Sequence, residues 1–392
     1  MVKSIIDTDL YKLTVSNAYY QLYRSAEGTF KFNDRNHEKY DYNFLKFLDE
    51  EFTKLSYLKM TDEEYEYLLS IRFLSTNYTE WLKNFQFEKD KIKYYLNDED
   101  GLEIEVTDKL YKSTLYEVPI LAIVSEARSK WLKMNIFEND VRKRIEHKVN
   151  YANEEKLNFS EFGTRRRYSY DVQEYIISYL KRNSKTCNGT SNVYLAMKYN
   201  MTPIGTFPHE WVMFHAGISG FKTANLTALN DWIKVYDGDL GIALIDTYTT
   251  KSFLHTLTLK QAKLLDGFRQ DSGDEIEVGN MIINKLKSFN IDPTTKTIVF
   301  SNALNFEKFK KINDYFKGKI KVAAGIGTNL TNDVTNNEKY KPANIVMKLS
   351  KCRYSPRDFW EDVIKISDDT GKSIGNSFKF EIAKNELHLN EL

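Results

Sequence analysis

The chain has 392 residues, of which 42% are hydrophobic and 14% aromatic, and this length suggests two or three domains with sizeable cores. Its 56 Lys and Arg residues nearly balance its 55 Asp and Glu residues, which leaves a net charge of +1. Because counterion-driven binding of nucleic acid needs a basic surface, this balance argues against a general nucleic-acid-binding protein.

The chain carries two cysteines, Cys187 and Cys352, without a CxxC pair or a His and Cys cluster at metal-ligand spacing. We therefore expect neither a disulfide framework nor a structural zinc site. The N-terminus turns acidic at Asp7, before any apolar stretch of signal-peptide length. The longest apolar run, Val118 to Val124, is far too short to span a membrane. These features predict a cytoplasmic protein that has no membrane partner.

The first part of the chain is rich in Tyr, Phe, Lys and Glu and shows mainly helical spacing of its apolar residues. The expected elements are helices at Asp41–Leu58 and Asp62–Phe73, a strand at Leu102–Val106, one long helix at Ile123–Lys148 and a further helix at Asp171–Lys181.

From about residue 158, short apolar strands alternate with turns and amphipathic segments such as Glu275–Phe289. The expected strands are Pro203–Phe207, Gly241–Ile245, Thr297–Phe300, Val322–Gly325 and Ile345–Leu349. Most of the 17 glycines also lie in this half of the chain. This alternation favours a parallel sheet or a (β/α) barrel, in which chemistry is located on the loops at the C-terminal ends of the strands.

Two loops after predicted strands carry small polar residues that suit a phosphate. The segment Gly325-Ile326-Gly327-Thr328 turns directly out of a strand, so its N–H groups and the Thr328 hydroxyl could bind phosphate oxygens. The preceding strand ends in Ser301 and Asn302. A Gly-x-Gly turn can equally be structural, so this pattern alone leaves both interpretations open.

Another loop combines a guanidinium group with a carboxylate. Arg269 and Asp271 are two residues apart, so on a strand both side chains would face the same side. An arginine can bind a carboxylate or phosphate through two hydrogen bonds, and an aspartate can bind a ribose diol or a metal ion. Ser272 or Asp274 could instead cap a following helix, but capping does not account for Arg269.

His209 is the histidine whose setting most suggests chemistry. It is expected just beyond the Pro203–Phe207 strand, and Asp246, at the end of the next strand, could orient its imidazole. A lone histidine is more often structural, and we interpret His215, on the following helix, in that way. The other histidines are interpreted as surface or core residues: His37, His147, His255 and His388.

Three consecutive arginines, Arg165 to Arg167, follow Phe162 and a small turn. A solvated basic helix start is the simplest explanation. However, cations near a helix N-terminus oppose the helix dipole, so an anionic group is expected to compensate them. Phe162 could also stack on a flat ring.

Six motifs, in this order along the chain, resemble the nicotinate phosphoribosyltransferase family. They are Asp9 to Thr14, Glu161 to Arg166, Gly189 to Asn192, Gly205-Thr206-x-x-His209, Arg269-x-Asp271-Ser272-Gly273-Asp274 and Gly325 to Thr328. Each motif is weak alone, but six in the family's order make a chance match improbable.

The resemblance implies an α/β fold of the type II phosphoribosyltransferases: an irregular (β/α) barrel with an N-terminal α/β domain that the C-terminal tail completes. We accordingly expect an N-terminal domain at residues 1–135, joined by residues 350–392, and a barrel domain at residues 136–349. The resemblance further implies NAD salvage from nicotinate and 5-phosphoribosyl 1-pyrophosphate, with coupling to ATP and with Mg²⁺ as cofactor. A monomer and a homodimer both remain open.

The resemblance also implies roles for single residues. His209 matches a histidine that ATP phosphorylates, and Asp246 matches an acid beside it. Asp271 matches a ribose or magnesium contact, which makes Asp246 and Asp271 the expected Mg²⁺ ligands. The expected substrate-binding residues are Tyr11, Phe162, Arg165, Ser191, Thr206, Arg269, Ser301, Asn302, Gly325, Gly327 and Thr328.

Ser191 bears on the choice of substrate. Relatives that use nicotinamide carry Asp at the matching position, where a carboxylate can accept from an amide but would repel a substrate carboxylate. Ser191 therefore favours nicotinate. The alternatives are a nicotinamide phosphoribosyltransferase, a quinolinate phosphoribosyltransferase, which would need more converging cations, and a non-catalytic sensor of phosphosugars or pyridine nucleotides.

Overall fold

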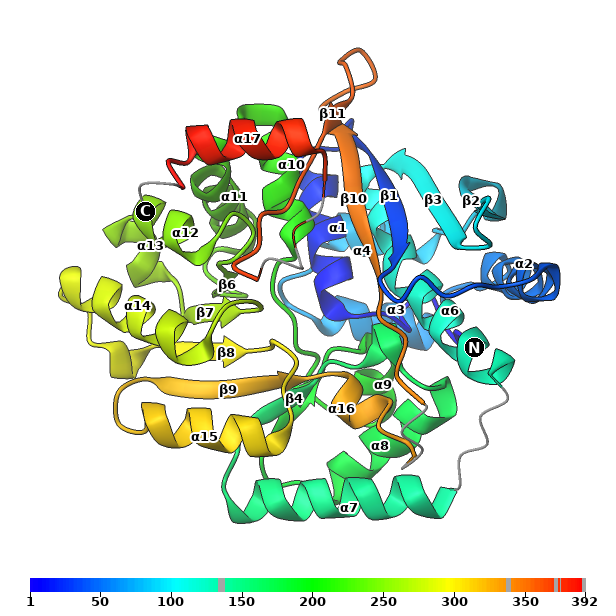
Figure 1. Ribbon diagram of the computed structural model, residues 1–392, viewed down its shortest axis with the longest axis horizontal. Helices are drawn as coiled ribbons and strands as arrows, with labels where there is room; N and C mark the ends of the chain where they lie inside the picture. Colours follow the sequence, from blue (N-terminus) through cyan, green and yellow to red (C-terminus); the bar gives the residue numbers. More distant parts are fainter. Residues whose placement is uncertain (133–137, 336–339, 370–372, 374, 390–392) are drawn as a thin grey trace.

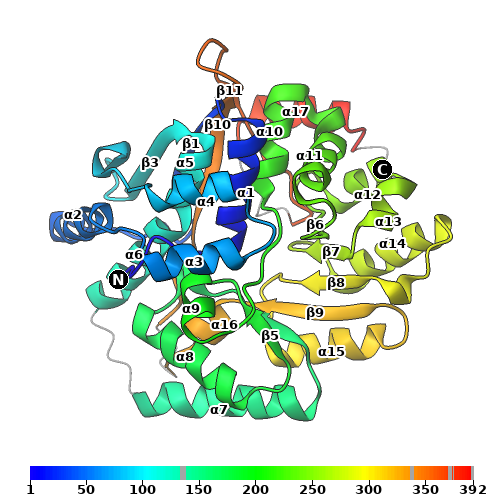
Figure 2. The same cartoon turned by 180° about the vertical axis from the view of Figure 1, so that it is seen from behind.

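Two sheets of different kinds organise the chain and occupy different halves of the molecule (Figures 1 and 2). The computed structural model describes residues 1–392 except for 133–137, 336–339, 370–372, 374 and 390–392. Within the described residues, none of the helices has the length and apolar character needed to cross a membrane.

The first sheet is antiparallel and brings together segments from near the two ends of the chain. It has the order β11-β10-β1-β3-β2 and comprises β1 (Glu27–Asp34), β2 (Ile92–Leu96), β3 (Leu102–Lys109), β10 (Ile345–Arg353) and β11 (Glu361–Asp362). Buried Phe30 and Phe32 of β1 lie opposite Leu349 and Met347 of β10, and such apolar cross-strand pairs stabilise a sheet. The prediction that the C-terminal tail completes the N-terminal α/β unit is thus confirmed.

The second sheet is parallel, as the alternation of strands and helices predicted. It has the order β5-β4-β9-β8-β7-β6 and comprises β4 (Phe159–Glu161), β5 (Cys187–Thr190), β6 (Ile242–Leu244), β7 (Gly267–Gln270), β8 (Thr297–Phe300) and β9 (Lys321–Ile326). The edge strands of this ladder are β5 and β6. Because neighbouring strands are parallel, their C-terminal ends share one edge of the sheet.

Helices surround both sheets (Figure 1). The first in chain order are α1 (Leu10–Leu22), α2 (Tyr42–Ser56), α3 (Asp62–Ser70), α4 (Thr76–Lys83), α5 (Leu110–Ser113) and α6 (Glu117–Trp131). Those that follow are α7 (Glu138–Glu154), α8 (Tyr170–Asn183), α9 (Val193–Lys198), α10 (His209–Ser219), α11 (Phe221–Tyr236), α12 (Thr250–Thr256), α13 (Leu259–Leu264), α14 (Glu275–Ser288), α15 (Phe306–Phe316), α16 (Thr328–Thr331) and α17 (Ser377–Glu386).

The single helix predicted over Ile123–Lys148 is wrong, because α6 ends at Trp131 and α7 begins at Glu138. The two helices meet different surroundings. Residues Glu117–Ser129 of α6 are buried on every side, whereas α7 buries one apolar stripe, and its other described residues are half-buried or exposed. The apolar residues of both helices recur at helical spacing, and for this reason the sequence predicted a single helix.

Two predicted strands also need correction. Pro203–Phe207 is not a strand, since only Pro203 forms an isolated bridge, with Thr190. Gly205 instead packs so closely on α1 that a Cβ there would lie 2.9 Å from the Tyr11 nitrogen. Ile345–Leu349 is a strand as predicted, but it lies in β10 of the antiparallel sheet and not in the parallel one. The domain boundaries stay a prediction.

A buried ion pair fixes the N-terminal segment to the loop after β4. The Arg167 guanidinium donates to Asp7 Oδ1 at 2.8 Å and to Asp7 Oδ2 at 3.0 Å, and both side chains are fully buried. Burial alone would raise the pKa of Asp7, but the charge and hydrogen bonds of Arg167 hold it below its usual 3.8.

We predict that Asp7→Asn lowers the free energy of unfolding by about 3–5 kcal/mol, because it leaves a buried guanidinium without its countercharge. Urea unfolding at pH 7 measures the loss. The folded-state pKa of Asp7 is depressed, so its stabilisation is complete above pH 3.8 and is lost as the pH falls through the folded-state value. The control is Asp62→Asn, whose exposed pair with Lys83 should matter little. Equal losses in the two variants would contradict the prediction.

Candidate active site

The C-terminal ends of the parallel strands open into one cavity of about 370 Å³, whose other walls come from α1 and β10. His209 and Asp271 line this cavity, while Asp246 does not line it and is fully buried beside His209. All of the predicted substrate-binding residues line it as well: Tyr11, Phe162, Arg165, Ser191, Thr206, Arg269, Ser301, Asn302, Gly325, Gly327 and Thr328. The structure thus brings together groups from distant parts of the chain.

An aromatic ring lies on the glycine-containing strand beside the cavity. A Cβ at Gly325 of β9 would lie 2.4 Å from the Phe162 ring, so only glycine lets the ring approach this closely. The guanidinium carbon of Arg269 also lies 5.5 Å from the centre of the Phe162 ring. This places a cation, a flat apolar surface and the start of the Gly327-Thr328 turn along one wall.

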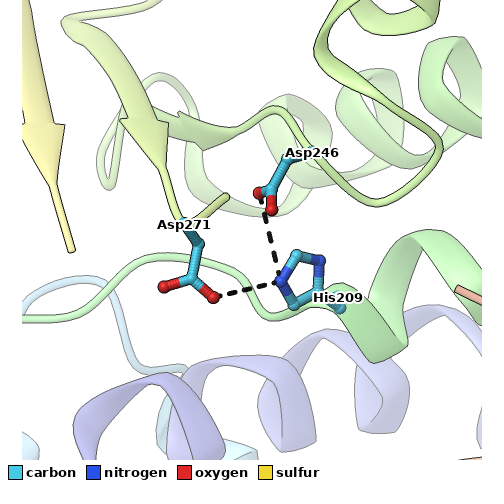
Figure 3. A group of neighbouring side chains, drawn as sticks. All are labelled: His209, Asp246 and Asp271. Carbon is cyan, nitrogen blue, oxygen red and sulfur yellow. Dashed lines mark hydrogen bonds and ion pairs between the residues drawn. The ribbon is translucent and has the colours of Figure 1, made fainter. Parts of the chain in front are cut away.

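His209 is the first residue of α10, so it begins a helix and does not follow a strand as predicted. Its Nδ1 atom lies 2.9 Å from Thr247 Oγ1. Its Nε2 atom lies 2.9 Å from Lys365 Nζ, 3.4 Å from Asp271 Oδ2 and 4.0 Å from Asp246 Oδ1. Figure 3 shows the imidazole facing both carboxylates. The residue that contacts Nδ1, and so fixes the ring, is Thr247 and not Asp246 as the sequence suggested.

These contacts assign the proton of the imidazole. A lysine ammonium can only donate, so Nε2 of His209 accepts from Lys365 and Nδ1–H donates to Thr247. Burial, together with the charge of Lys365, lowers the pKa of His209 from 6.5 to about 4, although Asp246 opposes this shift. At neutral pH the ring is therefore uncharged and carries a lone pair on Nε2, which is the form that acts as a nucleophile.

Ser191 contacts a carboxylate of this chain. Its hydroxyl donates to Asp9 Oδ1 at 2.8 Å, and Arg165 Nε lies 4.0 Å from Asp9 Oδ2. Burial raises the pKa of Asp9, although Arg165 and the Ser191 hydrogen bond oppose the shift. The serine and the arginine thus share one acidic neighbour at the cavity wall.

Comparison with known proteins covers nearly the whole chain. The sequence model described as the nicotinate phosphoribosyltransferase (NAPRTase) family matches residues 157–391, and the one for the N-terminal domain of that family matches residues 6–125. The chain is 38% identical to a nicotinate phosphoribosyltransferase of Desulforapulum autotrophicum over 96% of each chain. It is 37% identical to one of Chromohalobacter salexigens over 99% of each. The chain belongs to the nicotinate phosphoribosyltransferase family.

Solved structures of the family agree with this assignment. A crystal structure of nicotinate phosphoribosyltransferase from Porphyromonas gingivalis matches with a TM-score of 0.97 at 37% identity, covering 99% of this chain and 100% of that one. One from Vibrio cholerae matches with a TM-score of 0.92 at 30% identity, covering 99% and 94%. The family resemblance predicted from the six motifs is confirmed.

This nicotinate phosphoribosyltransferase family member has more cations in the cavity than the sequence predicted. Arg35, Lys348 and Lys365 lie in none of the six motifs, and Arg166 lies in the second motif but was given no role of its own. Burial and the neighbouring Arg165 and Arg35 lower the pKa of Arg166 to about 10. Burial, with Arg165 and Lys365, lowers the pKa of Lys348 to about 8, although Glu117 opposes this. Cations that depress one another's pKa values form a site for an anion.

The sequence did contain a signal for two of these residues. Lys348 alternates with buried Met347 and Leu349 in β10, and Lys365 interrupts the apolar run Val363-Ile364-Lys365-Ile366. A single lysine inside a buried stretch must have a specific reason to be there, because burying its charge is costly. No equally clear signal pointed to Arg35, which follows β1.

The expected Mg²⁺ ligands lie close together. Donor atoms of His209, Asp246 and Asp271 all lie within 4.8 Å of one another. Asp246 Oδ1 is buried and has no hydrogen-bond partner among the described residues. Burial would raise the pKa of Asp271, but the positive charges of Arg269 and Lys365 hold it well below its usual value. Because Mg²⁺ prefers oxygen ligands, the two carboxylates fit this ion better than the imidazole does.

We predict that an NMR titration of His209 gives a pKa of about 4 in the unaltered chain and a higher value, toward 6.5, in Lys365→Met. Removing the ammonium removes a charge that disfavours protonation, while Asp246 and Asp271 remain and favour it. Lys379→Met, a tail lysine that pairs with Glu361, serves as the control and should leave the titration unchanged. An unchanged His209 titration in Lys365→Met would contradict this account.

Proposed function

We propose that the chain transfers the 5-phosphoribosyl group of 5-phosphoribosyl 1-pyrophosphate to nicotinate, forming nicotinate mononucleotide and pyrophosphate for NAD synthesis. We further propose that ATP hydrolysis is coupled to this step through a phosphohistidine at His209, in the cytoplasm, with either a monomer or a homodimer as the active form. One observation carries the proposal: a single cavity combines an excess of cations, aromatic side chains and a neutral histidine beside two carboxylates.

The aromatic and cationic walls suit nicotinate. We infer that the pyridine ring lies against Phe162 and Tyr11, which both line the cavity. Its carboxylate would meet Arg165 or Arg269, whose planar guanidinium groups can each form two hydrogen bonds with it. This arrangement would leave the ring nitrogen free to attack the sugar.

The displacement itself needs charge compensation more than proton transfer. The lone pair of the ring nitrogen forms the bond to C1 of the ribose, and the bond from C1 to the pyrophosphate oxygen breaks with its electrons. The leaving pyrophosphate carries the growing negative charge, which Arg35, Arg166 and Lys348, as lining residues of the same cavity, would stabilise. The Gly327-Thr328 turn would hold the 5′-phosphate through N–H groups and the hydroxyl. Mg²⁺, when held by Asp246 and Asp271, would supply further neutralisation of the phosphates.

The surroundings of His209 suit transfer of a phosphoryl group. Its Nε2 lone pair would attack the γ-phosphorus of ATP while the bond to the ADP oxygen breaks. Nδ1 would keep its proton and continue to donate it in a hydrogen bond to the Thr247 hydroxyl. The phosphoryl group would add about −2 charge next to Lys365 and at the N-terminus of α10, both of which favour an anion. We infer that this added charge raises the affinity of the cation-lined cavity for the phosphosugar.

We predict that the chain forms nicotinate mononucleotide from nicotinate and 5-phosphoribosyl 1-pyrophosphate, and that ATP raises the rate. In His209→Ala the rate with ATP should equal the rate without it, because no nitrogen remains to accept the phosphoryl group. Chromatography of the product and of ADP measures both quantities. His255→Ala, an exposed histidine on α12, is the control and should keep the full response to ATP.

Two outcomes would contradict the proposal in different ways. Absence of product in the unaltered chain would remove the enzymatic assignment and leave a sensor that binds without turnover. Full enhancement by ATP in His209→Ala would remove the coupling through this residue while leaving the transfer reaction in place.

We predict that Ser191→Asp lowers kcat/KM for nicotinate by about tenfold or more, because it sets a second carboxylate beside Asp9 and repels the substrate carboxylate. The loss for nicotinamide should be smaller, so the ratio of the two kcat/KM values should shift toward the amide. Ser191→Ala removes the same hydroxyl without adding charge and is the matched control. If both variants lose nicotinate activity equally, Ser191 does not discriminate by charge.

A further inference from the structure

The turn that would hold the 5′-phosphate has an outer face as well as an inner one. Gly327 and Thr328 line the cavity. Asn329, which follows directly, and Asp333, just beyond α16, instead line a separate groove of about 420 Å³ against α7. Figure 1 shows α7 running along the edge of the molecule, beyond α8 and α16. The short helix α16 therefore connects the cavity to a surface that the transfer reaction does not use.

Two cationic side chains of α7 form hydrogen bonds with this outer face. The Lys148 ammonium donates to the carbonyl oxygen of Asn329 and to Asp333 Oδ2, the latter at 2.5 Å. Arg144, one helical turn earlier, donates to Asp333 Oδ1 at 2.8 Å. One carboxylate thus receives both cations, while the lysine also reaches the backbone one residue beyond Thr328.

The inner side of the same turn is held separately. The Thr331 hydroxyl donates to the Gly163 carbonyl at 3.0 Å, in the loop that carries Phe162 and Arg165. The turn is therefore fixed from both sides, by a hydroxyl toward the cavity loop and by an ammonium from α7. The side chain of Lys148 is 14% exposed, and burial lowers its pKa even though Asp333 opposes the shift. A lysine kept in such a position needs these two acceptors.

We propose that Lys148, supported by Arg144, is a positioning residue that sets the Gly327-Thr328 turn for the 5′-phosphate. The proposal rests on the proposed function, because it assumes that this turn binds the phosphosugar. Lys148 does not line the cavity and would touch no substrate. Its effect would pass through the Asn329 carbonyl to the Thr328 backbone and hydroxyl.

The test is Lys148→Met, which keeps the aliphatic stem and removes the donor. We expect KM for 5-phosphoribosyl 1-pyrophosphate to rise about tenfold, as for the loss of one charged hydrogen bond, while KM for nicotinate stays within about twofold. Lys148→Arg restores a donor and should recover most of the affinity. Lys143→Met, a cation of the same groove on the same helix, controls for the change in net charge and should leave both KM values unchanged.

Calorimetric titration of 5-phosphoribosyl 1-pyrophosphate into each variant measures the same effect without turnover, and thermal unfolding measures stability. Unchanged phosphosugar affinity in Lys148→Met would overturn the proposal, as would an equal rise of both KM values with a lowered Tm, which indicates a general structural role. If the unaltered chain forms no nicotinate mononucleotide, the proposed function fails, whereas an active chain that is insensitive to Lys148→Met removes only the positioning role.

Discussion

The arrangement of the site depends on one constraint: several positive charges are collected in a largely buried cavity with too few carboxylates to neutralise them. Burial lowers the pKa values of Arg166 and Lys348, and neighbouring cations lower them further. Buried charge of one sign is unfavourable unless a partner supplies the other. The like charges destabilise the folded chain at the cavity, and its hydrophobic core and ion pairs such as Asp7 with Arg167 stabilise it elsewhere. An anionic ligand would neutralise the positive charge that the carboxylates of the protein leave uncompensated.

Opposing electrostatic effects act on the protonation of His209. Two carboxylates would favour a charged ring, whereas burial and Lys365 favour the neutral one, and the neutral ring prevails. The position at the start of α10 adds a partial positive charge from the helix. Lys365 and the start of α10, which disfavour a proton on Nε2, would also stabilise the negative charge of a phosphoryl group on it.

Local patterns were sufficient for much of the fold and of the site. The strands β6, β8 and β9 follow from apolar runs that end in glycine or polar residues, and the loops after β8 and β9 carry Ser301 and Thr328. The strand β7, which contains Arg269, was not among the predicted strands. Other features depend on contacts distant in sequence. The spacing of α6 and α7 does not show that one is buried on all sides, and the alternation in β10 does not show which strand it joins. Lys348 and Lys365 were missed for this reason, since each reaches the cavity from a segment whose partner lies far away in the chain.

The pairing of β1 with β10 has a consequence for synthesis of the protein. Glu27 and Arg353, which form an ion pair across these strands, are 326 residues apart. While the nascent chain leaves the ribosome, β1 has β3 on one side and an unpaired edge on the other until β10 emerges. An unpaired edge can recruit strands of other molecules, so this interval is when aggregation is most favoured and when a chaperone would be most useful. The cavity is complete only after that interval ends, because Lys348 and Lys365, which line it, belong to the same late part of the chain.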